Sequence, residues 1–159
     1  GGIIQVQSAT ITNTFDNDQE TFADVTGVTV TITPTRSDSK ILVMYNGMGA
    51  MEATNRFGHV RIVRVIGGTT STDIYVGDQG ESNQARTSNT IVSPNNYQYQ
   101  QFSGTFMDSP ATTSAVTYKM QIAAGDQGYK FNIGRGDENS NEFSRGRFPT
   151  SITVMEVSG

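Results

Sequence analysis

The stretch that decides the fold is residues 28–34, which read Val28-Thr29-Val30-Thr31-Ile32-Thr33-Pro34. Apolar and hydroxyl side chains alternate here with a period of two, and every residue before the proline is β-branched. This alternation predicts a β-strand with one buried and one exposed face. Proline cannot donate a hydrogen bond to a neighbouring strand, so the strand is predicted to end there.

Similar runs recur along the chain, while signals for helices are nearly absent, since leucine occurs once (Leu42). The runs lie at residues 4–7, 41–46, 60–63, 74–76, 118–122, 129–133 and 152–155. We therefore predict an all-β fold, a jelly-roll β-sandwich of about 8–10 antiparallel strands, in a single domain over residues 1–159. An immunoglobulin-like sandwich is the alternative, but its usual core tryptophan and cysteine pair are missing.

Residues rich in Gly, Asn, Asp and Ser separate these runs and predict turns, for example at residues 93–96. The tetrapeptide Gly-Asp-Gln-Gly occurs at residues 77–80 and again at residues 125–128. The second copy lies between two strong strand patterns. It predicts a hairpin turn in which glycine supplies a positive φ.

The composition is polar but weakly charged: 16% of residues are charged, and there are 21 Thr, 14 Ser, 11 Asn, 10 Gln and 17 Gly. The absence of cysteine excludes disulfides and thiol catalysis. The net charge of −4 argues against nucleic-acid binding, and no apolar run is long enough to insert into a membrane. A surface of neutral hydrogen-bonding groups suits a protein exposed outside cells. The chain starts with Gly1-Gly2, so we expect a domain of a longer protein.

Catalysis is not expected. His59 is the one histidine and lies within a strand pattern, so a nucleophile–histidine pair would depend on that residue alone. A carboxylate pair of the glycosidase type stays open, because the sequence does not fix distances between its 15 acidic residues. The sequence predicts a non-enzymatic protein without a cofactor.

Two acidic loops are candidates for calcium binding. One contains Asp16, Asp18 and Glu20, and the other contains the run Asp137-Glu138-Asn139. Alternating carboxylates and amides offer the oxygen ligands that calcium prefers. Neither loop has the glycine and distal glutamate of an EF-hand, so solvated loops are the alternative.

The second acidic loop is also a candidate receptor-binding site. Arginine, amide and carboxylate groups alternate in it and could bind sugars or anionic glycans; they belong to Arg135, Asp137, Asn139, Asn141 and Arg145. Local ion pairing is the alternative, and at a surface it contributes little to stability.

Residues 41–51 are apolar on both faces, which predicts a central strand covered on both sides. Met44, Met48 and Met51 in this run are candidates either for a subunit contact or for the core. Farther on, Tyr97 and Tyr99 share one strand face, and a bulge at residues 100–101 would bring Phe102 and Phe106 onto it. Those four rings predict a core strand or an aromatic surface for a partner.

Several segments resemble, in order, a module of tailed-phage proteins, especially those of marine and cyanobacterial phages. They are residues 3–6, 10–15, 22–34, 39–43, 106–113, 117–119 and 151–157. In that family the module forms the C-terminal part of a fibre or another virion protein. The resemblance implies a head similar to the trimeric heads of C1q and TNF.

The resemblance thus implies a homotrimeric virion protein, the head of a tail or capsid fibre that binds a glycan or protein on the host surface. Two alternatives remain open. One is a capsid decoration or cement protein that contacts other virion proteins. The other is a carbohydrate-binding module of a secreted bacterial protein.

Overall fold

The computed structural model describes residues 1–95 and 97–159; Asn96, the last residue of the expected turn at 93–96, lies outside them. No helix in these two ranges is long and apolar enough to cross a membrane. The described residues form strands β1 (Ile3–Ile11), β2 (Phe15–Asn17), β3 (Ala23–Ile32), β4 (Lys40–Met51), β5 (Arg56–Ile66), β6 (Thr70–Asp73), β7 (Asn89–Ser93), β8 (Gln100–Asp108), β9 (Val116–Ala124), β10 (Phe131–Ile133) and β11 (Thr150–Val157).

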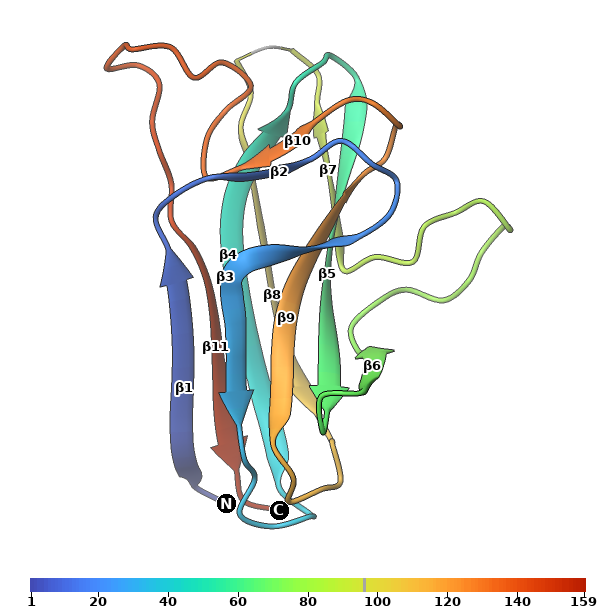
Figure 1. The fold of residues 1–159 in the computed structure, drawn as a ribbon, viewed down its shortest axis with the longest axis vertical. Coiled ribbons are helices and arrows are strands. Elements are labelled where there is room, and N and C mark those ends of the chain that lie inside the picture. Colours follow the sequence, from blue (N-terminus) through green and yellow to red (C-terminus); the bar gives the residue numbers. More distant parts are fainter. Residues whose placement is uncertain (96) are drawn as a thin grey trace.

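Eight of these strands build a jelly roll (Figure 1). One sheet has the order β1-β11-β4-β8, and the other has the order β3-β9-β5-β7. When these eight strands alone are numbered along the chain, the first sheet has the order 1-8-3-6 and the second has the order 2-7-4-5, which is the strand order of a jelly roll. All their pairings are antiparallel. The predicted fold class is confirmed, and β2, β6 and β10 extend the two sheets.

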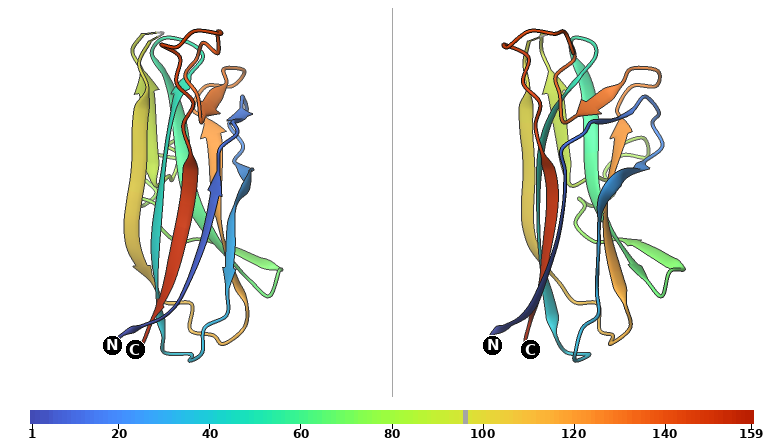
Figure 2. Two further views of the ribbon diagram at one scale, coloured as in Figure 1. Left: turned by 90° about the vertical axis from the view of Figure 1, so that its left-hand side faces the viewer. Right: turned by 60° about the vertical axis from the view of Figure 1, so that its left-hand side comes forward.

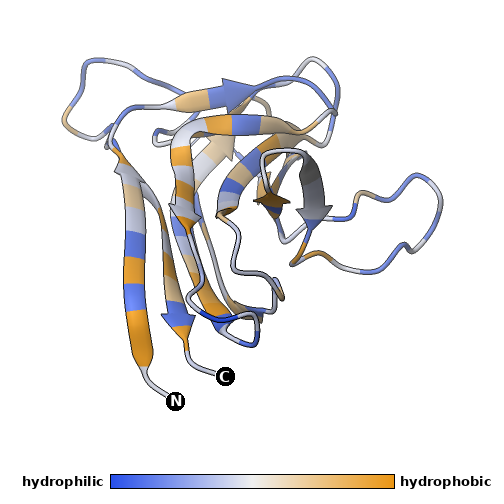
Figure 3. Ribbon diagram, turned by 60° about the horizontal axis from the view of Figure 1, so that its bottom comes forward, coloured by the Kyte–Doolittle hydropathy of each residue, from blue (hydrophilic) through white to orange (hydrophobic). Residues whose placement is uncertain are grey.

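Strand β3 has the two faces that its sequence predicts. Val28, Val30 and Ile32 are buried in the core, whereas Thr29 and Thr31 are exposed. Bands of high and low hydropathy also alternate along β1, the strand that begins at N in Figure 3, although Ile4 and Val6 are exposed there. Most of the inward side chains are Val and Ile, which pack well on a pleated surface.

A bulge in β3 departs from simple alternation. Its pairing with β9 shifts register between Asp24 and Thr29, and Gly27 lies in the bulge with φ of +87°. Val25 and Val28 are therefore both buried although three positions separate them. A residue with a side chain rarely adopts this conformation, which explains the glycine.

Strand β4 is central, as predicted, with β11 on one side and β8 on the other. Ile41, Val43 and Tyr45 face the core, and the next positions in register, such as Leu42 and Met44, are half-buried on the outer face. The opposite sheet covers only the core face. The sequence predicted that both faces of β4 are covered, but within one chain only the core face is covered.

Two local expectations need correction. Residues 125–128 form a turn in which Gly128 has φ of +90°, but β9 and β10 belong to different sheets, so the turn is not a hairpin. Phe102 points into the core, while Tyr97 and Tyr99 precede β8 in a loop. The four aromatic rings therefore do not share a strand face.

The sandwich has two distinct ends, which we call the base and the apex. Both termini lie at the base, at the bottom of Figure 1, where the Ser158 amide donates to the Gly2 carbonyl at 3.0 Å. Loop 134–149 lies at the apex in every view (Figures 1 and 2). Any segment joined to either terminus would thus start at the base, far from this loop.

Candidate functional site

The candidate site is the surface made by residues 94–95 and 97–99 and by loop 134–149 at the apex, here called the apical surface (Figure 2). All five residues that the sequence suggested for receptor binding lie in loop 134–149. An isolated β-bridge joins the two ends of this loop, because Arg135 pairs with Arg147 and Phe148 donates its amide to the Gly134 carbonyl at 2.9 Å. The apex therefore presents the loop on a fixed stem.

Arg145 is the centre of this surface and is already paired. Its Nη2 lies 3.1 Å from a Glu138 carboxylate oxygen and 4.0 Å from one of Glu142. Its guanidinium carbon lies 4.8 Å from the centroid of the Tyr97 ring. Only 15% of the Arg145 side chain is exposed. These ion pairs agree with the alternative of local ion pairing, and the contact with Tyr97 joins the two loops.

Aromatic rings complete the apical surface, and the sequence reasoning missed the most exposed one. Tyr99 packs against Phe148 with ring centroids 5.5 Å apart and lies against Gly136. Phe143 is fully exposed, and Tyr97 is 63% exposed. The sequence does hold a sign of this exposure, because Phe143 lies in a polar loop of Asn, Ser, Glu and Gly that has no strand pattern. Exposed aromatic groups beside a fixed arginine suit contact with a partner.

The other suggested residues are placed less uniformly. Asn139 and Asn141 are exposed, so their amides are free to meet a ligand. Arg135 instead donates to the Asn132 Oδ1 at 3.1 Å, and Asp137 is half-buried. One carboxylate oxygen of Asp137 is buried without a hydrogen-bond partner among the described residues. Arg135 and Asp137 therefore shape the stem of the loop more than its exposed tip.

Neither expected calcium site is assembled. Within residues 1–95 and 97–159, no three His, Cys, Asp or Glu side chains come together in a group that could hold a metal ion. Asp16 and Glu20 are exposed, Asp18 accepts a hydrogen bond from the Gln19 side chain at 2.6 Å, and Glu138 is paired with Arg145. These carboxylates serve local turns and ion pairs instead.

The methionines suggested for a subunit contact separate into two groups. Met51 is buried in the core, so it has no surface to offer a partner. Met44 and Met48 are half-buried on the outer face of the β1-β11-β4-β8 sheet. There the strand register places Val6, Met155, Leu42 and Met107 in one row across the four strands.

This outer face is uncharged over most of its area. Next to the apolar row, the register aligns Ser8, Thr153, Met44 and Thr105, and then Thr10, Ser151, Asn46 and Ser103. The charged residue Lys40 lies at the base end of β4, outside these rows. We call these three uncharged rows the outer face.

His59 has surroundings that suit a structural or binding role. Its Nδ1 lies 2.8 Å from the Thr90 hydroxyl, and burial lowers its pKa, with the Asp126 charge acting in the opposite direction. It lines a cavity outside the apical surface together with Glu20, Phe22 and Asn83.

Comparison with known proteins gives little. No family model and no curated protein matches the chain. Two solved structures of infectious bursal disease virus overlay on it. The Gx strain structure is 9% identical over 99% of this chain and 39% of its own, with a TM-score of 0.42. The Gt strain structure is 10% identical over 97% and 38%, with a TM-score of 0.40. This chain thus spans about two fifths of either one, and the jelly-roll assignment depends on its own strand order.

Proposed function

We propose that this chain is a non-enzymatic virion protein, the head of a phage fibre that contacts the host cell surface through the apical surface. The observation that carries the proposal is the opposition of the two ends. Both termini leave from the base, while exposed Phe143 and Tyr97 lie with Arg145 at the apex. A head joined to a fibre at its base would present these loops outward, and rigid sandwiches commonly carry binding loops at one end.

The proposal has a direct test in the binding of the labelled chain to bacterial cells. We expect Phe143→Ser to reduce cell binding at least about tenfold, because exposed aromatic anchors supply much of the affinity of a surface contact. Ile3→Ser is the matched control, since Ile3 at the base is 62% exposed, as much as Tyr97. Equal binding by both variants would contradict the role of the apical surface.

Self-association belongs to the same proposal. We infer that the outer face is covered by further copies of this chain in a homotrimer, because a face of apolar and hydroxyl groups offers no charge for a charged partner surface to pair with. In a ring of three copies, one edge of this face on each copy would pack against the other edge on the next copy. Three weak apical contacts on one host surface would then act together.

A capsid decoration protein is the second candidate, and the outer face is the observation that favours it, since the same neutral rows could contact a capsid subunit. A cryo-EM map of the virion distinguishes the two. Density for the chain at fibre tips supports the fibre head, whereas a lattice of copies on the shell supports decoration.

A further inference from the structure

A cavity of about 510 Å³ lies beside the paired strands β5 and β9, and it shares no residue with the apical surface. Its volume is within the range of small-molecule sites, roughly 300–1,000 Å³. Three segments distant in sequence line it. They contribute Glu20 and Phe22 from the loop before β3, His59, Ala124 and Gly125 from the sheet and the end of β9, and Asn83 and Ala85 from loop 74–88.

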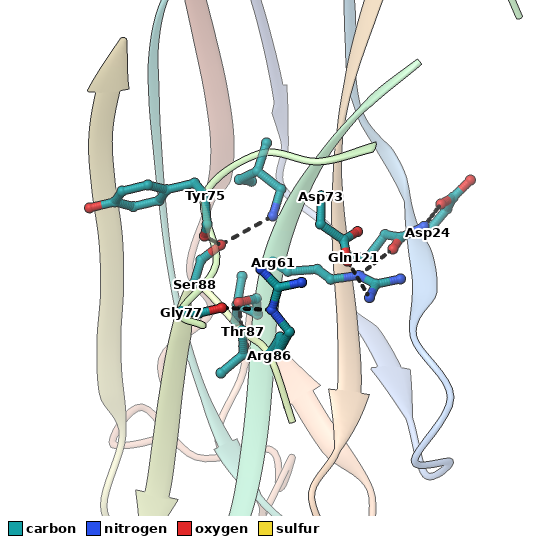
Figure 4. Close-up of polar contacts among 11 residues, drawn as sticks. Asp24, Arg61, Asp73, Tyr75, Gly77, Arg86, Thr87, Ser88 and Gln121 are labelled. Atoms are coloured by element: carbon teal, nitrogen blue, oxygen red, sulfur yellow. Dashed lines mark hydrogen bonds and ion pairs between the residues drawn. The ribbon is translucent and has the colours of Figure 1, made fainter. Parts of the chain in front are cut away.

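Loop 74–88 forms one wall of this cavity and is fixed to the sheet by polar contacts (Figure 4). Arg86 Nε donates to the Gly77 carbonyl at 2.7 Å, which closes the loop on itself. The Thr87 hydroxyl donates to the Val60 carbonyl at 2.7 Å, and the Ser88 hydroxyl donates to the Tyr75 carbonyl. The wall is therefore formed before any ligand arrives, which lowers the entropic cost of binding.

The opposite wall is also held in place. The Glu20 backbone amide donates to the Gln127 side-chain oxygen at 3.0 Å, and the Gln127 backbone amide donates to a Glu20 carboxylate oxygen at 3.2 Å. Arg61 covers the Phe22 ring at 4.0 Å from its centroid. Its guanidinium is in turn fixed by Gln121 at 2.8 Å (Figure 4). The ring and the carboxylate thus line the cavity in set positions.

His59 also lines the cavity, and its two ring nitrogens have different neighbours. Its Nδ1 is engaged by the Thr90 hydroxyl, and its Nε2 lies beside Gly125. A Cβ atom at position 125 would lie 2.8 Å from Phe57 Cβ and 3.2 Å from that Nε2, so the glycine avoids Phe57 as well as the imidazole. The neighbouring lining residues Ala124 and Ala85 are also small.

The lining specifies the class of ligand. It combines an aromatic ring, a carboxylate, an imidazole and an amide, and none of its residues is Lys or Arg, so a phosphate or another anion would find no cation among them. Glu20 and His59 are the two His, Cys, Asp or Glu side chains of this lining, and no group of three such side chains that could hold a metal ion occurs among the described residues. The hydroxyl groups of a ligand can both donate to Glu20 and accept from Asn83, while its C–H groups pack on the part of the Phe22 ring that lines the cavity. We propose that this cavity binds one neutral pyranose ring of a saccharide.

The test is a titration of the ¹⁵N-labelled chain with methyl α-D-glucopyranoside, methyl β-D-galactopyranoside and N-acetylglucosamine, followed by NMR. We expect at least one sugar to give saturable shifts at Phe22, Asn83 and Gly125, with a dissociation constant in the millimolar range. If none of the three sugars moves these signals at about 50 mM, the proposal is wrong.

Variants localise the binding. Asn83→Ala and His59→Ala should each weaken the binding of the sugar about fivefold or more, because each removes a hydrogen bond to it. Asn13→Ala is the control, since Asn13 is an exposed loop asparagine outside the cavity. Sugar shifts unchanged in both cavity variants would place the binding elsewhere and overturn the proposal. Because the cavity and the apical surface share no residue, this titration and the cell-binding assay can fail independently.

Discussion

Glu156 is the most buried acidic residue, and its hydrogen bonds define its chemistry. Its carboxylate accepts from the Gln5 side-chain amide at 2.7 Å, from the Thr35 backbone amide at 2.7 Å and from the Thr35 hydroxyl at 2.8 Å. Burial raises its pKa, but these donors outweigh burial and lower the pKa to about 2. The carboxylate therefore joins β1 and β11 to the segment after β3 as an ionised group.

We expect Glu156→Gln to lower the free energy of unfolding at pH 7 by about 2–3 kcal/mol, because an amide NH₂ would face donors that now meet a carboxylate oxygen. A lowered pKa means that this stabilisation is present above pH 4.5 and is lost as pH falls toward 2. The difference between wild type and variant in urea unfolding should therefore shrink from pH 7 to pH 2.

The control for that comparison is Glu138→Gln, which breaks a surface ion pair with Arg145. Pairs of this kind contribute little, so the change at pH 7 should stay below about 1 kcal/mol. A Glu156→Gln variant as stable as wild type at pH 7 would show that the carboxylate is not needed at this position.

At the scale of elements, the strands follow from their own residues, while the contacts between sheets do not. The alternation in β3 and the two-sided run in β4 predicted which strands exist and which side chains face the core. No local pattern shows that Asp108 on β8 accepts from Arg64 on β5 at 2.6 Å and from the Tyr118 hydroxyl on β9 at 2.7 Å. Such pairs depend on how distant strands meet, which period-two patterns leave open.

The same limit applies to the candidate site. The sequence placed Arg145, Asn139 and Asn141 in one polar loop, because the residues are close in sequence. It missed Phe143 as an exposed group and could not bring Tyr97 to Arg145. It offered two acidic loops as calcium candidates, but alternating carboxylates in a loop indicate ligand types and not their convergence on one point, and no three acidic side chains converge among the described residues.

The bulge at Gly27 gives a prediction at this scale. Gly27→Ala should destabilise the fold by at least about 1 kcal/mol, because the backbone has φ of +87° and a Cβ atom would lie 2.7 Å from Ile11 Cγ2. Gly2→Ala is the matched control: Gly2 has no atom within 4 Å of such a Cβ and should leave the melting temperature unchanged. Equal melting temperatures for the two variants would contradict the role of the bulge.

For the whole molecule, the proposed trimer predicts a change in mass. Light scattering of the purified chain should give about three times its 17.2 kDa. Met107→Lys, in the apolar row of the outer face, should reduce this to one chain while the circular dichroism spectrum stays that of a folded sandwich, since Met107 is half exposed. A wild-type chain that stays monomeric at micromolar concentration would contradict the trimer.

At the same scale, the proposed roles fall on different parts of the molecule. The base carries the termini, the outer face is neutral, the cavity beside β5 and β9 has the groups to bind a sugar, and the apical surface carries exposed rings. The polar, weakly charged composition agrees with this arrangement, because threonine fills outward strand positions and glycine, asparagine and aspartate fill the loops.

The central claim, that the apical surface binds the host, is tested most directly by competition for adsorption. Host cells are incubated with the purified chain, and adsorption of the phage proposed to carry it is then counted. The account predicts that the wild-type chain and Ile3→Ser block adsorption, whereas Phe143→Ser does not at the same concentration. Adsorption that the wild-type chain leaves unchanged at saturating concentration would contradict the account.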